Sequence, residues 1–357
     1  MTFIRDTFNF LKRERIWTLL FIFLVSAYVY VANRPEKKIP KLPSPALEKL
    51  QEAETRLKNE IKVEGGVGNY LAGRPKLLIV FSLFTAFLMV TFFLGVVVDV
   101  LWFARPSWRN RLQPATGPPE ARSWSIGTVF KAIILFVLAT LALTVVMAIL
   151  KRILFHAVSP NFIILIHTTL TDLICIGFVI WFIERQGGNW KDLGFRGIQW
   201  LKDIWTGLVG YAAILPLFFT VLFALIAIVQ FFNYEPPPHP LVQVFLEEER
   251  SPWLIGYSLF LACVAGPILE EIFFRGFCYP AFKKRWGAGK ALILTASFFS
   301  LIHQNAFAFL PVFILGLGLG YLYEKRGTLV PSIMLHVVHN TVFIGYFFLA
   351  KEVLTAK

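Results

Sequence analysis

The chain has 357 residues, of which 57% are hydrophobic and 16% are charged, and its formal net charge is +13 at pH 7. The apolar residues recur in runs of about 17–25, long enough to cross a bilayer, so the composition excludes an ordinary soluble domain. In such a protein the positive charge indicates basic cytoplasmic loops and not a nucleic-acid partner.

The N-terminal part begins with a basic segment, residues 1–15, followed by an apolar run over residues 16–32. The bulky Tyr30 stands where a cleavage site would need a small residue, so the run is predicted to be an uncleaved membrane anchor. The polar loop 33–76 follows, and within it residues 46–63 carry leucine and isoleucine at helical spacing. This helix is predicted to be solvated outside the membrane, with the membrane surface or a partner protein as alternatives.

The remaining apolar runs predict further spans, about nine in all, and no segment alternates as a β-strand does. The class is therefore all-α, a polytopic helical membrane protein. The two shortest predicted spans, 288–305 and 307–324, are separated by a tight turn only. The predicted spans after the anchor are 77–103, 129–150, 161–183, 205–232, 252–275, 288–305, 307–324 and 328–350.

The loops predict the orientation. Lys and Arg are concentrated in the loops that lie inside when the N-terminus is inside, although the 33–76 loop argues the other way. We therefore expect an integral membrane protein with its N-terminus inside, in the cytoplasmic (inner) membrane if the host is bacterial. This topology puts Arg275, at the end of its span, near the cytoplasmic surface.

The stretch 270–275 reads Glu-Glu-Ile-Phe-Phe-Arg and closes an apolar run. Charged residues inside a span are costly and usually mark a functional site. Glu271 and Arg275 are four residues apart, so they share a helix face and can pair. Glu270 points about 100° away and is left to act on another group.

Two later motifs add histidines and an amide. His303 ends the motif Phe-Ser-Leu-Ile-His, and His336 and Asn340 lie four residues apart on one helix face. His339 ranks below His336, either supporting it or facing a neighbouring helix. The histidines without such companions, namely His156, His167 and His239, are expected to be structural.

These groups suit hydrolysis of a peptide bond. Glu270 can act as general base on water, and His303 can share that water or pass its proton to the leaving amine. His336 and Asn340 can donate hydrogen bonds to the oxyanion. Glu271 and Arg275 would support these residues.

A metal alternative uses the same side chains. Glu270, His303 and His336 could be three ligands of a zinc ion with an open fourth position. No HExxH motif is present, and Glu271 would have to act as base while paired with Arg275. We therefore prefer a mechanism that requires no cofactor, with zinc as the alternative.

Each residue also has a structural interpretation. The Glu271–Arg275 pair could fix a helix end, and His336 and Asn340 could simply hydrogen-bond across helices. Their joint occurrence within the membrane favours function. Gly316 and Gly320 have the GxxxG spacing of a close helix contact.

In this order, Glu-Glu-x-x-x-Arg, Phe-x-x-x-His and His-x-x-x-Asn resemble the motifs of the CPBP family, the CAAX-processing and bacteriocin-processing (Abi) proteases that include the Ras-converting CAAX endopeptidase. The resemblance covers residues 195–340. It implies an intramembrane protease in which Glu270 and His303 activate water, His336 and Asn340 form the oxyanion hole, and Glu271 and Arg275 support them. Members are often labelled metalloproteases, although a glutamate mechanism fits this branch better.

We therefore divide the chain into an N-terminal extension, residues 1–130, and a protease-like core, residues 131–357. The expected activity is cleavage of a membrane-associated peptide or protein substrate, with no nucleic acid involved. The alternative is a membrane protein that binds a peptide without cleaving it, as bacteriocin-immunity proteins are proposed to do.

Overall fold

The computed structural model describes residues 12, 14–32, 45–105, 107, 123–153, 158–195, 197, 199–232 and 251–355. Two residues singled out in the sequence, His156 and His239, lie outside this set. Every regular element among the described residues is a helix, which confirms the all-α prediction.

The described helices follow apolar or amphipathic runs, and proline or glycine marks several of their ends. Pro160 begins α8, where Ser159 accepts a hydrogen bond from the Asn161 amide. Gly327, with φ of 72°, ends α15 in the left-handed conformation that glycine adopts at low cost. The α-helices are α2 (Arg15–Ala32), α3 (Pro45–Val63), α4 (Val67–Ala72), α5 (Pro75–Ala104), α7 (Ile126–Ile153), α8 (Pro160–Arg185), α9 (Trp200–Phe231), α11 (Pro252–Phe260), α12 (Gly266–Glu271), α13 (Tyr279–Trp286), α14 (Ala288–Ile302), α15 (Ala306–Arg326) and α16 (Val330–Thr355).

Seven helices in the described part are long and apolar enough to cross a membrane: α5, α7, α8, α9, the continuous helix Pro252–Trp286, α15 and α16. The predicted count of nine is therefore not confirmed. Of the other two predicted spans, α14 has 15 residues and a length of about 22 Å, short of the roughly 30 Å of a hydrocarbon core. The other, α2, has 18 residues, a length of about 27 Å, and is not among those seven helices.

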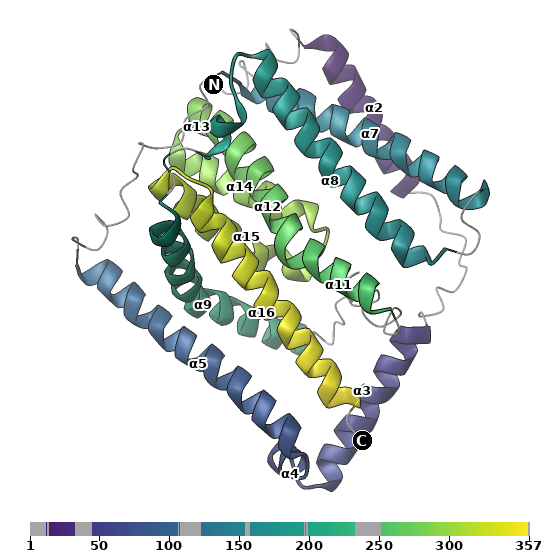
Figure 1. Ribbon diagram of the computed structural model, residues 1–357, viewed down its shortest axis with the longest axis vertical. Helices are drawn as coiled ribbons and strands as arrows, with labels where there is room; N and C mark the ends of the chain where they lie inside the picture. Colours follow the sequence, from purple (N-terminus) through teal and green to yellow (C-terminus); the bar gives the residue numbers. More distant parts are fainter. Residues whose placement is uncertain are drawn as a thin grey trace. The chain divides into compact units, whose positions relative to one another are not determined.

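The chain forms two compact units. Residues 1–42 and 121–190 make the first unit, in which α7 packs against both α2 and α8 (Figure 1). Residues 43–120 and 191–357 make the second. These spatial units differ from our division at residue 130. That division concerns where the protease-like core begins along the chain, and it stays a prediction.

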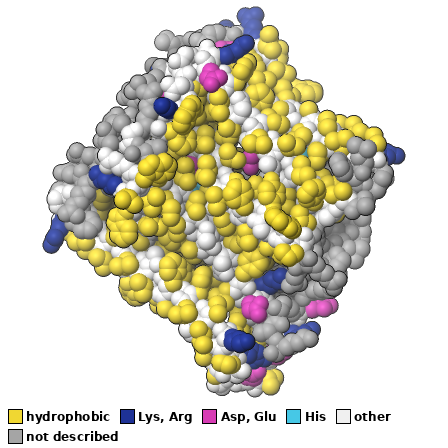
Figure 2. All heavy atoms as spheres, viewed as in Figure 1, with side chains coloured by type: hydrophobic (Ala, Val, Ile, Leu, Met, Phe, Trp, Pro, Cys, Tyr) yellow, Lys and Arg dark blue, Asp and Glu magenta, His cyan; other side chains and the backbone are white. Residues whose placement is uncertain are grey.

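In the second unit, α9 packs against α5, α15 and α16, while α14 and α15 form a helical hairpin (Figure 1). The short turn Trp190–Leu193 is a 3₁₀ helix, and it leads to Gly194, whose carbonyl accepts a hydrogen bond from the Leu329 amide at 3.1 Å. Figure 2 shows that hydrophobic side chains dominate the visible surface of the helices, as expected for contact with lipid.

The amphipathic helix predicted over residues 46–63 is present as α3, but it is not solvated on all sides. Leu57 and Ile61 pack on a cluster that includes Tyr70, Leu77 and Leu349 of α16. At least part of the apolar face of α3 is therefore covered by the chain itself.

Candidate active site

The helix Pro252–Trp286 carries both glutamates and differs from the prediction in its length. The span was expected to end at Arg275, but the helix continues to Trp286. It widens into π-helical turns at Leu261–Ala265 and Ile272–Cys278, on either side of α12. Such turns are rare and frequently lie at functional sites.

The first π turn leaves a backbone carbonyl that Asn340 satisfies. The Gly266 amide bonds to the Leu261 carbonyl, and Pro267, which could otherwise pair with the Ala262 carbonyl in a π turn, has no N–H. The Asn340 side-chain amide donates to the Ala262 carbonyl at 2.8 Å, which joins α16 to this helix. One amide hydrogen of Asn340 thus has a structural partner, and a second remains.

Glu271 lies at the centre of a buried polar cluster. Its Oε1 accepts a hydrogen bond from Arg275 Nη1 at 2.7 Å, as the spacing predicted, and it lies 3.0 Å from His336 Nδ1. All three side chains are at most 2% exposed. Because Arg275 compensates the Glu271 carboxylate and an ionised carboxylate only accepts, Nδ1 of His336 donates this hydrogen bond.

Arg275 is buried inside the helix bundle. Its Nη2 donates to the Gly316 carbonyl at 3.1 Å, and Gly316 is the central residue of the 21-residue helix α15. Its guanidinium also lies 4.5 Å from the centre of the Phe299 ring. The expected end of the span at Arg275 is wrong, because the helix continues to Trp286. The depth of Arg275 below the cytoplasmic surface stays a prediction.

Glu270 is the accessible member of the pair. Its side chain is 35% exposed, and its Oε2 lies 3.7 Å from Nε2 of His336, which is too long for a direct hydrogen bond. His336 thus has Glu271 at one ring nitrogen and Glu270 near the other. A water molecule is of the right size to join Glu270 to this second nitrogen.

His303 follows the last residue of α14 and is exposed. Its Nδ1 lies 2.8 Å from the Phe299 carbonyl, which can only accept, so Nδ1 carries a hydrogen and Nε2 of the neutral ring is an acceptor. The Phe299 ring is fully buried and contacts the rings of both His303 and His336, with centres 4.9 and 5.6 Å apart. Phe299 is therefore the residue that connects the two histidines in the described structure.

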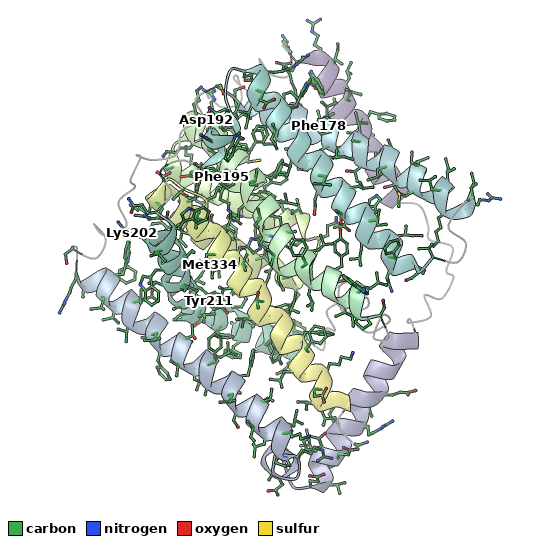
Figure 3. All side chains as sticks on the ribbon, in the orientation of Figure 1. Phe178, Asp192, Phe195, Lys202, Tyr211 and Met334 are labelled. Carbon is green, nitrogen blue, oxygen red and sulfur yellow. The ribbon has the colours of Figure 1, made fainter. Side chains whose placement is uncertain are left out.

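His339 faces the neighbouring helix α9. Its ring contacts those of Phe218 and Tyr211, with centres 5.0 and 6.2 Å away. Tyr211 and Met334, both labelled in Figure 3, lie along the contact between α9 and α16. Of the two roles considered for His339, packing against a neighbour is the one these contacts support.

The glycines of α15 make the contact predicted from their spacing. A Cβ at Gly316 would lie 3.1 Å from Ala296 of α14, and one at Gly320 would lie 2.8 Å from Leu292. Gly318, on another face, contacts Ile214 of α9. This close approach holds Phe299 beside Arg275.

Sequence reasoning missed a second buried ion pair. Arg326 donates to Asp203 at 2.6 and 3.0 Å, and both side chains are at most 1% exposed. The other Asp203 oxygen accepts a hydrogen bond from the amide of Gln199, the residue before α9, and ties it to the first turn of the helix. The position of Asp203 in a first helical turn was readable from the sequence. Its partner Arg326, 123 residues away, could not be read from local spacing.

The same end of the bundle holds a third polar group. Glu324 accepts hydrogen bonds from the Tyr279 hydroxyl and from Lys283, each at 2.8 Å. These contacts tie the extended end of the Pro252–Trp286 helix to α15. They explain why that helix continues as an ordered element beyond Arg275.

The side chains proposed as zinc ligands do not form a metal-binding group. Within the described residues, no set of three or more His, Cys, Asp and Glu is gathered as a metal site would require. Nδ1 of His336 bonds a carboxylate and Nδ1 of His303 bonds a backbone carbonyl, which leaves Nε2 of each ring available to a metal or to substrate. The choice between zinc and a mechanism without a cofactor therefore stays a prediction. We derive no catalytic step through a metal.

Comparison with known proteins agrees with the motifs. Residues 252–342 match the family model "Type II CAAX prenyl endopeptidase Rce1-like". UPF0177 protein YaiF of Lactococcus lactis subsp. lactis (strain IL1403) is 27% identical over 198 residues, covering 54% of this chain and 81% of that protein. No solved structure matches significantly. The family resemblance predicted from the motifs is confirmed for residues 252–342.

Proposed function

We propose, with the likeness of residues 252–342 to the type II CAAX prenyl endopeptidases as premise, that this chain is an intramembrane endopeptidase. The observation that carries the proposal is the buried Glu271–Arg275–His336 cluster beside the partly exposed Glu270. All four residues lie inside the matched segment. Hydrolysis needs a base that can take a proton from water. The partly exposed Glu270 carboxylate, beside the oriented His336 imidazole, can supply one.

Glu270 is the proposed general base. It takes a proton from a water molecule, whose oxygen attacks the carbonyl carbon of the scissile bond and gives a tetrahedral oxyanion. The proton then passes to the leaving amide nitrogen, directly or through Nε2 of His303. The C–N bond breaks, and the products are a carboxylate and an amine.

His336 is the proposed oxyanion donor. Because its Nδ1 hydrogen is committed to Glu271, Nε2 can donate only when the ring carries both protons. The proposed role therefore requires the doubly protonated ring at the moment the oxyanion forms. The second amide hydrogen of Asn340 supplies a further donor, and one such donor is worth about 10²–10³ in kcat.

The proposed substrate is a peptide or protein held at the membrane. The partial exposure of Glu270 within an apolar helix supports entry of a peptide segment from within the bilayer. Cleavage near a C-terminus, as the family description suggests, is part of the proposal. The same experiment tests whether the substrate needs a prenyl group.

The test uses the full chain in liposomes with a library of membrane-anchored peptides, with and without a C-terminal prenyl cysteine, and reads the products by mass spectrometry. Glu270→Gln should lower turnover by about 10²–10⁴ while binding persists, because removal of a general base spares ground-state contacts. Asp99→Asn, which also neutralises a carboxylate within a span, is the matched control and should retain activity.

Identical products from wild type and Glu270→Gln would refute the protease assignment. Binding without cleavage by wild type would favour the non-catalytic peptide-binding alternative. Elemental analysis of the same preparations tests the cofactor prediction. Stoichiometric zinc, lost together with activity on chelation, would replace the glutamate mechanism by the metal one.

A further inference from the structure

The middle of α8 is polar although its ends are apolar. Residues 167–172 read His-Thr-Thr-Leu-Thr-Asp in a helix long enough to cross the membrane. This stretch lies in the first unit and outside the segment matched by the protease family. Polar residues at such depth are costly and require compensation.

The packing of α7 on α8 fixes what these residues face. The two helices are antiparallel, because Thr128 near the start of α7 bonds Gln186 after the end of α8, while Thr144 Oγ1 lies 3.0 Å from His167 Nε2. One helical turn from this contact, Thr140 of α7 and Thr171 of α8 share the faces of Thr144 and His167. They therefore oppose each other about 6 Å further along the contact.

The hydroxyls of Thr140 and Thr171 are buried and make no hydrogen bond anywhere in the described chain. Two other threonines of the same helices satisfy their hydroxyls within their own helix. Thr144 bonds the Thr140 carbonyl and Thr169 bonds the Leu165 carbonyl, each at 2.8 Å. Leaving two hydroxyls unsatisfied costs free energy, and buried polar groups nearly always have a partner, which is often an ordered water.

We propose that a water molecule bridges Thr140 and Thr171 near the middle of the membrane, as part of a polar track between α7 and α8. His167 stands one turn away on one side and Cys175 one turn away on the other, which gives the track three levels. A threonine hydroxyl can both donate and accept hydrogen bonds, so the ligand that suits two facing hydroxyls is a small neutral molecule that does the same. This water site does not depend on the proposed protease activity.

The first test compares the thermal unfolding of Thr140→Val, Thr171→Val and the double variant with wild type, using the full chain in nanodiscs. If water bridges the hydroxyls, each single variant lowers the midpoint, and the double variant is hardly lower than the singles because one bridge is lost in each case. If the contact is dry, removing an unsatisfied hydroxyl leaves the midpoint unchanged or raises it. Thr220→Val is the matched control, because that hydroxyl bonds its own-helix carbonyl at 2.7 Å and is exposed.

The second test detects the water directly. Solid-state NMR in bilayers should show rapid magnetisation transfer from water to Thr140 and Thr171, in contrast to lipid-facing residues such as Leu173 at the same depth. Transfer no faster than to Leu173 would overturn the proposal, whatever the unfolding data show. Rapid transfer from water to the remaining threonine, if it is lost in each single valine variant, would support the proposal.

Discussion

A single carboxylate, Glu271, holds the proposed site together. Its Oε1 receives hydrogen bonds from Arg275 and His336, which come from different helices. Breaking a buried ion pair on one side leaves an uncompensated charge, while replacing both partners by apolar residues of similar size is often tolerated. Glu271 therefore has two separable effects: it stabilises the protein by pairing with Arg275, and it orients the His336 ring.

Glu271→Met should lower the free energy of unfolding by about 3–5 kcal/mol, because Arg275 would then be buried without a counter-charge. The double variant Glu271→Met with Arg275→Met should recover most of this stability. Neither variant should cleave peptides, since His336 has lost the acceptor that orients it. Thermal unfolding and peptide cleavage, measured together, check both statements.

If the double variant is as unstable as the single one, Arg275 is not the reason for the instability. If the double variant is stable and fully active, Glu271 has no role in orienting His336. The first outcome tests the contact of Glu271 with Arg275, and the second tests its contact with His336.

The residues themselves show what the sequence could and could not predict. The i, i+4 spacing identified the Glu271–Arg275 pair. The hydrogen bond between Glu271 and His336 joins residues 65 apart, which no local pattern specifies. Asn340 was predicted only as an oxyanion donor or a general interhelical contact, yet Pro267 was a readable signal that a nearby carbonyl would need a donor from elsewhere.

At the scale of the elements, the position of the site depends on how closely α14 approaches α15. Gly316 allows that approach, and its carbonyl accepts from Arg275. The GxxxG spacing predicted a close contact, but it did not identify α14 as the partner. Nor did hydropathy show that the helix bearing both glutamates continues to Trp286, because its last turns are amphipathic and bind Glu324.

Gly316→Val should separate α14 from α15. A Cβ at this position already lies 3.1 Å from two atoms of Ala296 and 3.3 Å from Phe299, so the larger side chain must displace Phe299 from Arg275 and His336. Overpacking of this kind costs about 1–3 kcal/mol. We expect a lower unfolding midpoint and a loss of kcat larger than any change in KM.

Gly256→Val is the control, because nothing lies within 4 Å of a Cβ at Gly256 in α11. This variant should keep both stability and activity. Equal effects of the two valines would show that the α14–α15 contact is not what limits the site.

At the scale of the whole chain, the segment 45–105 is not a separate addition in space, because it belongs to the same compact unit as the candidate site. The Tyr70 hydroxyl donates to the Val353 carbonyl at 3.2 Å, which joins α4 to the last turns of α16. The helices α3 and α4 thus contact the C-terminal end of α16. The same helix carries His336 and Asn340 of the candidate site. Hydrophobic periodicity predicted α3 but could not show where its apolar face docks.

Ile61→Asp should release α3 from α16, because a carboxylate would replace an isoleucine packed against the cluster of Tyr70, Leu77 and Leu349. Val63→Asp is the matched control, because Val63 belongs to the same helix and is 87% exposed. Trypsin should cut within α3 faster in Ile61→Asp than in Val63→Asp, and the unfolding midpoint should fall only in the former. If both variants resist trypsin equally, the docking of α3 is not what orders it; if Ile61→Asp is cut faster but remains fully active, α3 stabilises the end of α16 without affecting His336.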